Sequence, residues 1–350
     1  KRLGEFEAVT RHDVKAVEYL IGEYLEAASS VLGEGTSLPS LREVVHIFCT
    51  SEDINNLAYA LTIKAATEQV WLPAIRALLD RLRGLAEAGA AVPMLAHTHG
   101  QPATPVTIGK EMAVFAHRLS RQITRVEATE YLGKINGATG TWAAHVVSVP
   151  GADWPTLARS FVEGLGLTWN PLTTQIESHD WQAELYADVA RAGRIAHNLA
   201  TDAWTYISMD YFHQNLAAQG STGSSTMPHK VNPIRFENAE ANLEVSNALL
   251  DSLASTLVTS RMQRDLTDST TQRNVGVAFG HAVLAYDNLV RGLDGIEINA
   301  ARMAQDLDAN WAVLGEAVQQ AMRAAAIAGA TGMANPYERL KELTRGHEVG

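Results

Sequence analysis

The sequence has little of several features that would place it in a broad class of protein. Cys49 is the one cysteine among 350 residues, so no disulfide can form within the chain, and we expect a reducing, cytoplasmic setting. No run of about 18 apolar residues is present and no secretory signal opens the sequence, so we expect no membrane partner. The formal net charge is −11, and the missing basic surplus disfavours a nucleic-acid partner.

Patterns typical of β-strands are also scarce. The segment HVVSV, residues 145–149, is closed by a proline and a glycine and could form a short strand or a hairpin arm. No series of alternating strands accompanies it, so the α/β and all-β classes are disfavoured.

Helical periodicity dominates instead. Apolar residues recur at three-, four- and seven-residue steps at Leu185, Val189, Ala192, Ala196, Leu199 and Ala203, and again at Leu243, Leu250, Leu253 and Leu257. Such narrow stripes are typical of helices packed side by side. We therefore predict an all-α fold built as a long-helix bundle.

The length and the clusters of glycine and proline predict three parts. A chain of 350 residues exceeds the usual size of one hydrophobic core. We expect an N-terminal helical domain at 1–38, a central helical bundle at 39–292 and a C-terminal helical domain at 293–350. Because the first residues, KRL, lack a methionine and the last, RGHEVG, end without a cap, we expect a piece of a longer protein.

The first polar cluster is GSSTMPHKVNP, residues 223–233. The ammonium of Lys230 and the amide of Asn232 together suit a carboxylate ligand. A serine hydroxyl, Ser224 or Ser225, held near that lysine and near backbone N–H groups could act as a base. On their own these residues are more often a solvated surface loop, since the glycine and prolines indicate only a loop.

The second cluster is MLAHTHGQPATP, residues 94–105. Either His97 or His99 could donate a proton near neutral pH. A metal site is disfavoured because no HExxH motif and no second thiolate accompany the two histidines. A pair of hydrogen-bonded turn histidines is the structural alternative.

Other polar segments also admit two interpretations. TSEDINN, residues 50–56, reads as a helix N-cap, whose N–H groups could also bind a carboxylate or phosphate. Arg264, Ser269 and Arg273 provide two guanidinium groups and a hydroxyl that suit a phosphate, although a solvated charged turn fits as well. A further polar segment is RHDV, residues 11–14.

Taken together, these segments resemble one family. GSSTMPHKVNP resembles the signature loop of the fumarase/aspartase superfamily. Within it, the sequence resembles the bacterial adenylosuccinate lyases at RHDVKAVEY, CTSEDINNLAYAL, HTHGQPATPVTIGKEMA, GKINGATG, NPLTTQIESHDW and QRDLTDSTTQRN. The resemblance keeps this order and runs from about residue 8 to residue 345.

The resemblance implies a homotetramer with a central helical core and with active sites shared between subunits. It also implies β-elimination of fumarate from two nucleotide substrates: adenylosuccinate, giving AMP, and the succinylated ribotide SAICAR, giving AICAR. No metal and no organic cofactor are expected.

The same resemblance implies a role for each matching residue. Ser224 would be the general base and His99 the general acid. Residues implied to hold the succinyl carboxylates and position the substrate are Thr50, Ser51, Thr98, Gln175, Ser225, Lys230 and Asn232. Residues implied to hold the phosphate are Arg264, Ser269 and Arg273, with Asn238 nearby, and those implied to face the nucleotide are Arg11, His12 and Asp13.

The sequence departs from the family pattern at His97, where arginine is usual in this branch. A second titratable group therefore stands beside the expected acid. The nucleotide contact that the family makes with an N-terminal arginine and tyrosine would lie before residue 1.

Three alternatives remain open. Another fumarate-releasing enzyme, such as argininosuccinate lyase, would share the loop but would not need the phosphate cluster of Arg264, Ser269 and Arg273. A non-catalytic relative, like the lens crystallins of this superfamily, would be favoured by loss of Ser224 or His99, and both are present. A coiled-coil interaction protein would explain the heptads but not the polar clusters.

Overall fold

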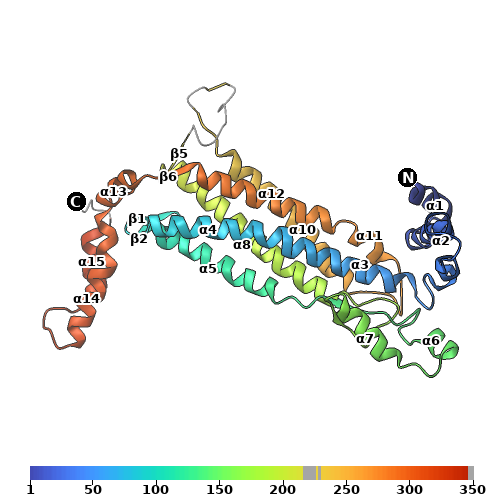
Figure 1. Cartoon of the computed structure of the whole chain (residues 1–350). Helices are drawn as coiled ribbons and strands as arrows, with labels where there is room; N and C mark the ends of the chain where they lie inside the picture. Colours follow the sequence, from blue (N-terminus) through green and yellow to red (C-terminus); the bar gives the residue numbers. More distant parts are fainter. Residues whose placement is uncertain (216–225, 228–229, 346–350) are drawn as a thin grey trace. The chain divides into compact units, whose positions relative to one another are not determined.

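A computed structural model describes residues 1–215, 226–227 and 230–345 (Figure 1). Its main helices are α1 Arg2–Thr10, α2 Asp13–Leu32, α3 Ser51–Ala66, α4 Leu72–Ala88, α5 Ile108–Glu127, α6 Ala143–Ser148, α7 Trp154–Gly164, α8 Asp180–Ser208, α10 Ile234–Leu257, α11 Thr267–Gln272, α12 Val275–Asp294, α13 Ala300–Asp308, α14 Gly315–Ile327 and α15 Pro336–Thr344. Short helical segments are η1 Leu38–Val44, η2 Thr67–Trp71 and η3 Trp311–Leu314. The prediction of an all-α fold is confirmed.

Strands within the described residues are short and form two-stranded sheets. They are β1 Pro93–Thr98, β2 Gln101–Thr107, β3 Leu132–Gly133, β4 Thr168–Trp169, β5 Phe212–Gln214 and β6 Ile296–Ile298. β1 pairs with β2 and β5 with β6 in antiparallel fashion, and β3 pairs with β4 in parallel. The β1–β2 hairpin lies on the MLAHTHGQPATP segment, where we predicted only a polar cluster.

The expectation of a strand or hairpin arm at residues 145–149 is wrong. Residues 143–148 form α6, and Trp142 just before it has a positive φ of 51°. Val147 is 85% exposed, so its β-branched side chain packs on no sheet. Without a partner strand, the β-propensity of two valines is a weak local preference.

The chain forms two compact units. Unit 1 consists of residues 1–72, 125–190 and 248–279, and unit 2 of residues 73–124, 191–247 and 280–350. The predicted division into three parts at residues 38 and 292 stays a prediction.

Unit 2 contains antiparallel helix neighbours that polar pairs tie together. Between α5 and α8, Arg118 pairs with Asn198, and Gln122, one turn further along α5, pairs with Arg191. Because the residue numbers of successive pairs rise along α5 and fall along α8, the two helices run antiparallel. The same relation holds between α8 and α10 and between α10 and α12, at Thr201–Glu240, Trp204–Glu237, Arg235–Asn288 and His281–Asn242.

The apolar stripes predicted from the sequence form the core. Leu199 and Ala203 on α8, and Leu243 on α10, have no exposed surface in unit 2. Leu185 and Leu250 are buried in the same way in unit 1. Removing such side chains from water is the main contribution that holds adjacent helices together.

Across residues 1–215, 226–227 and 230–345, no helix combines the length and the hydropathy that crossing a membrane would require.

Candidate active site

His99 lies at the tip of the β1–β2 hairpin in unit 2. Thr98 pairs with Gln101, which leaves His99 and Gly100 as a two-residue turn. Their φ angles are 55° and 71°, and positive φ at both central positions is typical of a type I′ turn. The turn presents an exposed imidazole on a short, hydrogen-bonded support, as a proton donor requires.

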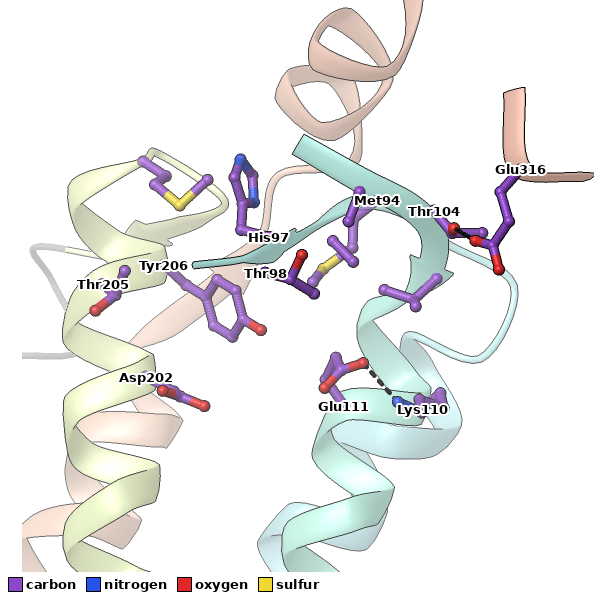
Figure 2. Close-up of a pocket in the computed structure, with 14 residues that line it drawn as sticks. Met94, His97, Thr98, Thr104, Lys110, Glu111, Asp202, Thr205, Tyr206 and Glu316 are labelled. Carbon is purple, nitrogen blue, oxygen red and sulfur yellow. Dashed lines mark hydrogen bonds and ion pairs between the residues drawn. The ribbon is translucent and has the colours of Figure 1, made fainter. Parts of the chain in front are cut away.

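A pocket of about 650 Å³ lies beside this hairpin, within unit 2 (Figure 2). Figure 2 shows Asp202 and Tyr206 of α8 on one side, with Thr98 of β1 and Glu111 of α5 on the other. Burial raises the pKa of the Asp202 carboxyl above its ordinary value, and the nearby charge of Glu111 raises it further. His97 lines the same pocket, so the residue that departs from the family pattern stands among carboxyl groups.

The signature loop is described only in part. Ser224 and Ser225 lie outside the described residues. Lys230 is exposed and its backbone N–H donates to the carbonyl oxygen of Met227, 3.0 Å away. Asn232 follows two residues later, and Gln214 at the end of β5 donates to the carbonyl of Val231, 2.9 Å away.

The start of α3 in unit 1 gathers hydroxyls beside an imidazole. Thr50 is the N-cap and Ser51 the first residue of α3, as the TSEDINN pattern predicts. Nε2 of His12 lies 3.3 Å from Oγ of Ser51, and Nδ1 of His12 accepts from the backbone N–H of Lys15. The helix start thus presents two hydroxyls next to a histidine from another segment, an arrangement suited to a carboxylate.

Arg11 and Asp13 flank that histidine. Arg11 ends α1 with φ 51°, and its N–H donates to the carbonyl of Glu7. A carboxyl oxygen of Asp13 accepts from the N–H of Val14 at 2.8 Å. The connection between α1 and α2 therefore holds all three residues of the RHD motif in a fixed backbone, with each of them exposed.

Arg264 is held between two buried carboxylates of unit 1. Nη2 donates to Glu52 at 2.9 Å, and Nη1 donates to the two oxygens of Asp268 at 2.7 and 2.8 Å. The guanidinium is therefore paired before any substrate enters, and the three groups together carry one net negative charge. Ser269 donates its backbone N–H to Asp268, and Arg273 ends α11 with an exposed side chain.

His179 supports this cluster from the segment that follows β4. Its Nε2 lies 3.1 Å from Asp268, and Gln182 lies 3.4 Å from its Nδ1, so the proton that bonds to Asp268 belongs on Nε2. Burial by itself would raise the pKa of Asp268, but hydrogen bonds from His179 and Arg264 outweigh it and lower that pKa. His179 has φ 62° and is 1% exposed, a strained backbone of the kind that collects at functional sites.

Glu52, His179 and Asp268 were missed as site residues, although each lies within a motif quoted for the family resemblance. Their position could have indicated them, because each is a histidine or an acid in a motif that also contains a predicted site residue. The contact between Arg264 and Asp268 spans only four residues, but the contacts of Glu52 with Arg264 and of His179 with Asp268 join distant segments, and nothing in the local sequence encodes them.

The structure brings some predicted residues of unit 1 into contact, while others are distributed over unit 2. In unit 1, His12 meets Ser51, and Arg264 lies with Ser269 around Asp268. In unit 2 are Thr98, His99, Lys230, Asn232 and Asn238, the last of which accepts from Asn242. Within the described part of the chain, no group of three or more His, Cys, Asp or Glu side chains could hold a metal ion.

Comparison with known proteins gives consistent matches along the chain. A lyase family model matches residues 2–247, and the model of the adenylosuccinate lyase C-terminal region matches residues 260–350. Adenylosuccinate lyase of Escherichia coli (strain K12) is 49% identical over 348 residues, which cover 99% of this chain and 73% of that protein. The enzyme of Vibrio cholerae serotype O1 is 48% identical over 349 residues, covering 99% of this chain and 74% of that protein.

Solved structures show the same fold. A fumarate lyase from Mesorhizobium sp. BNC1 aligns with a TM-score of 0.77 at 20% identity, covering 97% of this chain and 72% of that one. The 3-carboxy-cis,cis-muconate lactonizing enzyme of Pseudomonas putida aligns with a TM-score of 0.74 at 21% identity, covering 97% and 72%. At this level of identity the likeness concerns the fold alone.

Proposed function

The chain belongs to the adenylosuccinate lyase family, and from that premise we propose that it splits adenylosuccinate into AMP and fumarate and SAICAR into AICAR and fumarate. The observation that carries the proposal is 49% identity to the E. coli enzyme over 99% of the chain. The chain is accordingly a lyase that breaks a carbon–nitrogen bond.

The elimination needs a base on one side of the succinyl group and an acid on the other. Ser224 removes the proton from the carbon next to a carboxylate. The electron pair forms the double bond of fumarate, the carbon–nitrogen bond breaks, and its electrons pass to the nitrogen. His99 gives that nitrogen a proton, and its exposed place in the hairpin turn supports this role.

Negative charge develops on the carboxylate next to the carbon that loses its proton. Fixed donors and a cation around that carboxylate supply a large share of the rate enhancement. The residues proposed for this work are Thr50, Ser51, Gln175, Ser225, Lys230 and Asn232, with Thr98 beside the acid. The helix start that carries Thr50 and Ser51 supports the assignment, because it also presents backbone N–H groups.

The ribotide phosphate is assigned to Arg264, Ser269 and Arg273, with Asn238 nearby. Because two carboxylates already pair with Arg264, we assign the larger share of the phosphate contact to the exposed Arg273. Arg11, His12 and Asp13 would face the nucleotide, and the bond between His12 and Ser51 would align that side with the succinyl side.

The family resemblance and the composition support a proposal about assembly and location. We propose a homotetramer whose active sites draw residues from several subunits, and a cytoplasmic location in keeping with the single cysteine. Burial raises the pKa of the Cys49 thiol to about 11, so this cysteine is not poised to react as a thiolate.

Absorbance measurement during incubation with adenylosuccinate tests the activity directly. We expect conversion to AMP and fumarate, and conversion of SAICAR under the same conditions. Turnover of argininosuccinate with no turnover of either ribotide would place the chain with the other fumarate-releasing lyases and overturn the proposal.

A further inference from the structure

A buried ion pair joins Asp53 and Lys134 in unit 1. Nζ of Lys134 lies 2.8 Å from Oδ1 of Asp53, and neither side chain has any exposed surface. Lysine and aspartate are almost never fully buried unless they are paired. Because removing two charges from water is costly, such a pair is weak support for stability and indicates another use.

Asp53 collects donors from two separate segments. Its oxygens accept the backbone N–H of Thr50 at 2.9 Å, of Asn136 at 3.0 Å and of Gly137 at 3.1 Å. Together with the ammonium of Lys134, these bonds fix the carboxylate in one orientation. The side chain of Asp53 thus holds two backbone segments: the N-cap of α3 and the start of the NGATG loop, residues 136–140.

Asn56 joins the same two segments one turn further along α3. Its side-chain oxygen accepts the N–H of Lys134 at 2.8 Å, and its side-chain nitrogen donates to the carbonyl of Lys134 at 2.9 Å. Asn56 is 4% exposed. The first two turns of α3 therefore hold residues 134–137 through buried hydrogen bonds that exclude water.

The NGATG loop in turn positions Gln175. Nε2 of Gln175 donates to the carbonyl of Ala138 at 2.8 Å, and Asn136 donates to Thr173 at 2.7 Å. At Gly140, with φ 73°, an added Cβ would lie 2.2 Å from the carbonyl oxygen of Thr173. The loop and residues 173–175 consequently pack backbone against backbone, which leaves little room for either to shift.

We propose that Asp53 and Lys134 are positioning residues that set Thr50 and Ser51 at the correct separation from Gln175 for the succinyl carboxylates. Neither residue is accessible to substrate, so both act through the hydroxyls and the amide that they hold in place. This inference rests on the proposed function and adds to it a buried pair that determines the geometry of the carboxylate site.

Replacing Lys134→Met removes the ammonium and keeps a long side chain. We expect the dissociation constants for fumarate and succinate to rise about tenfold or more, because hydrogen bonds to a carboxylate weaken steeply when their donors are displaced. The dissociation constant for AMP is expected to change less than about twofold. AMP carries a phosphate but no succinyl group, and the residues proposed to bind the phosphate differ from those proposed to bind the succinyl carboxylates. The KM for adenylosuccinate should rise in parallel with the fumarate constant.

Lys64→Met is the matched control. Lys64 lies on α3 and, like Lys134, ties that helix to another segment, here through a 2.8 Å bond to the carbonyl of Gly166, but among the described residues it bonds to none that is proposed for the carboxylate site. We expect Lys64→Met to leave fumarate and AMP affinities unchanged. Equal losses for both lysine variants, or equal losses of fumarate and AMP binding by Lys134→Met, would overturn the inference in favour of a purely structural role.

A second variant keeps the test decisive if Lys134→Met does not fold. The double substitution Asp53→Asn with Lys134→Met removes both charges and leaves no buried charge unpaired. We expect the folded double variant to bind fumarate weakly and AMP normally, and normal fumarate binding would overturn the inference. Binding of fumarate by the unaltered chain without any turnover would contradict the proposed function instead, and the variants' fumarate affinities would still decide this inference.

Discussion

Oγ of Ser51 lies 3.3 Å from Nε2 of His12, so a hydroxyl at the start of α3 meets an imidazole from the start of α2. Nδ1 of the same imidazole caps α2 by accepting from Lys15, which fixes the ring plane. The two residues therefore form a small preorganised unit, in which the orientation of the serine hydroxyl depends on the histidine.

Loss of this hydroxyl should weaken substrate binding and also lower kcat, because the carboxylate that it would hold gains negative charge during the elimination. Hydrogen bonds to charged groups contribute about 1.5–3 kcal/mol, so Ser51→Ala should raise the KM for adenylosuccinate about tenfold or more. Steady-state kinetics measure the change, with Ser40→Ala as the control, because the hydroxyl of Ser40 donates to the backbone carbonyl of Ser37 and has no proposed role in substrate binding. Unchanged KM and kcat for Ser51→Ala would contradict the carboxylate role.

The two arginines of the phosphate cluster should behave differently. Arg264→Ala leaves Glu52 and Asp268 buried without their partner, and breaking such a pair costs about 3 kcal/mol or more in the free energy of unfolding. Arg273→Ala should leave that free energy unchanged and raise the dissociation constant for AMP. Urea unfolding and AMP titration of both variants measure these effects, and equal stability of the two would contradict the pairing of Arg264.

The hairpin turn should tolerate no side chain at Gly100 without loss of activity. Gly100 has φ 71°, a conformation that costs an L-residue about 1–2 kcal/mol. Gly100→Ala should therefore displace His99 and lower kcat, even though the space around Gly100 is open. Gly151→Ala is the control, since Gly151 also lies in open space but without a positive φ. Equal kcat values for the two variants would exclude the turn from the mechanism.

Stability should fall at acidic pH because of His145. This histidine is 5% exposed and packs against Phe48 and Trp154, and burial lowers the pKa of its imidazole. In the unfolded chain the imidazole has its ordinary pKa of about 6.5, and above that pH it is uncharged in both states. Below that pH the unfolded chain binds a proton more readily than the folded chain, so the free energy of unfolding falls as the pH falls. Thermal unfolding at pH 7.5 and pH 5.5 should show a smaller difference for His145→Phe than for the unaltered chain. An exposed histidine, His117, gives the control variant His117→Phe.

Features that depend on local pattern were predictable from the sequence. The stripes at Leu199 and Leu243 are buried as expected, and α3 begins where TSEDINN places an N-cap. Periodicity and capping act within one helix, so the sequence around a residue carries the information.

Features that depend on backbone conformation or on pairing between segments were not predictable. The hairpin at β1 and β2 has little alternation and several prolines, and its turn depends on positive φ at His99. The burial of Lys134 has no local indication, because its partner Asp53 lies 81 residues earlier. A lysine in sequence alone reads as a solvated charge, and only the tertiary contact reverses that interpretation.

The kcat of Ser224→Ala, measured beside that of Ser225→Ala, tests the elimination mechanism most directly. We predict that Ser224→Ala lowers kcat for adenylosuccinate by about 10²-fold or more, as the loss of a general base does, while Ser225→Ala mainly raises KM. A near-normal kcat for Ser224→Ala, or a large loss confined to Ser225→Ala, would contradict the assignment of Ser224 as the base.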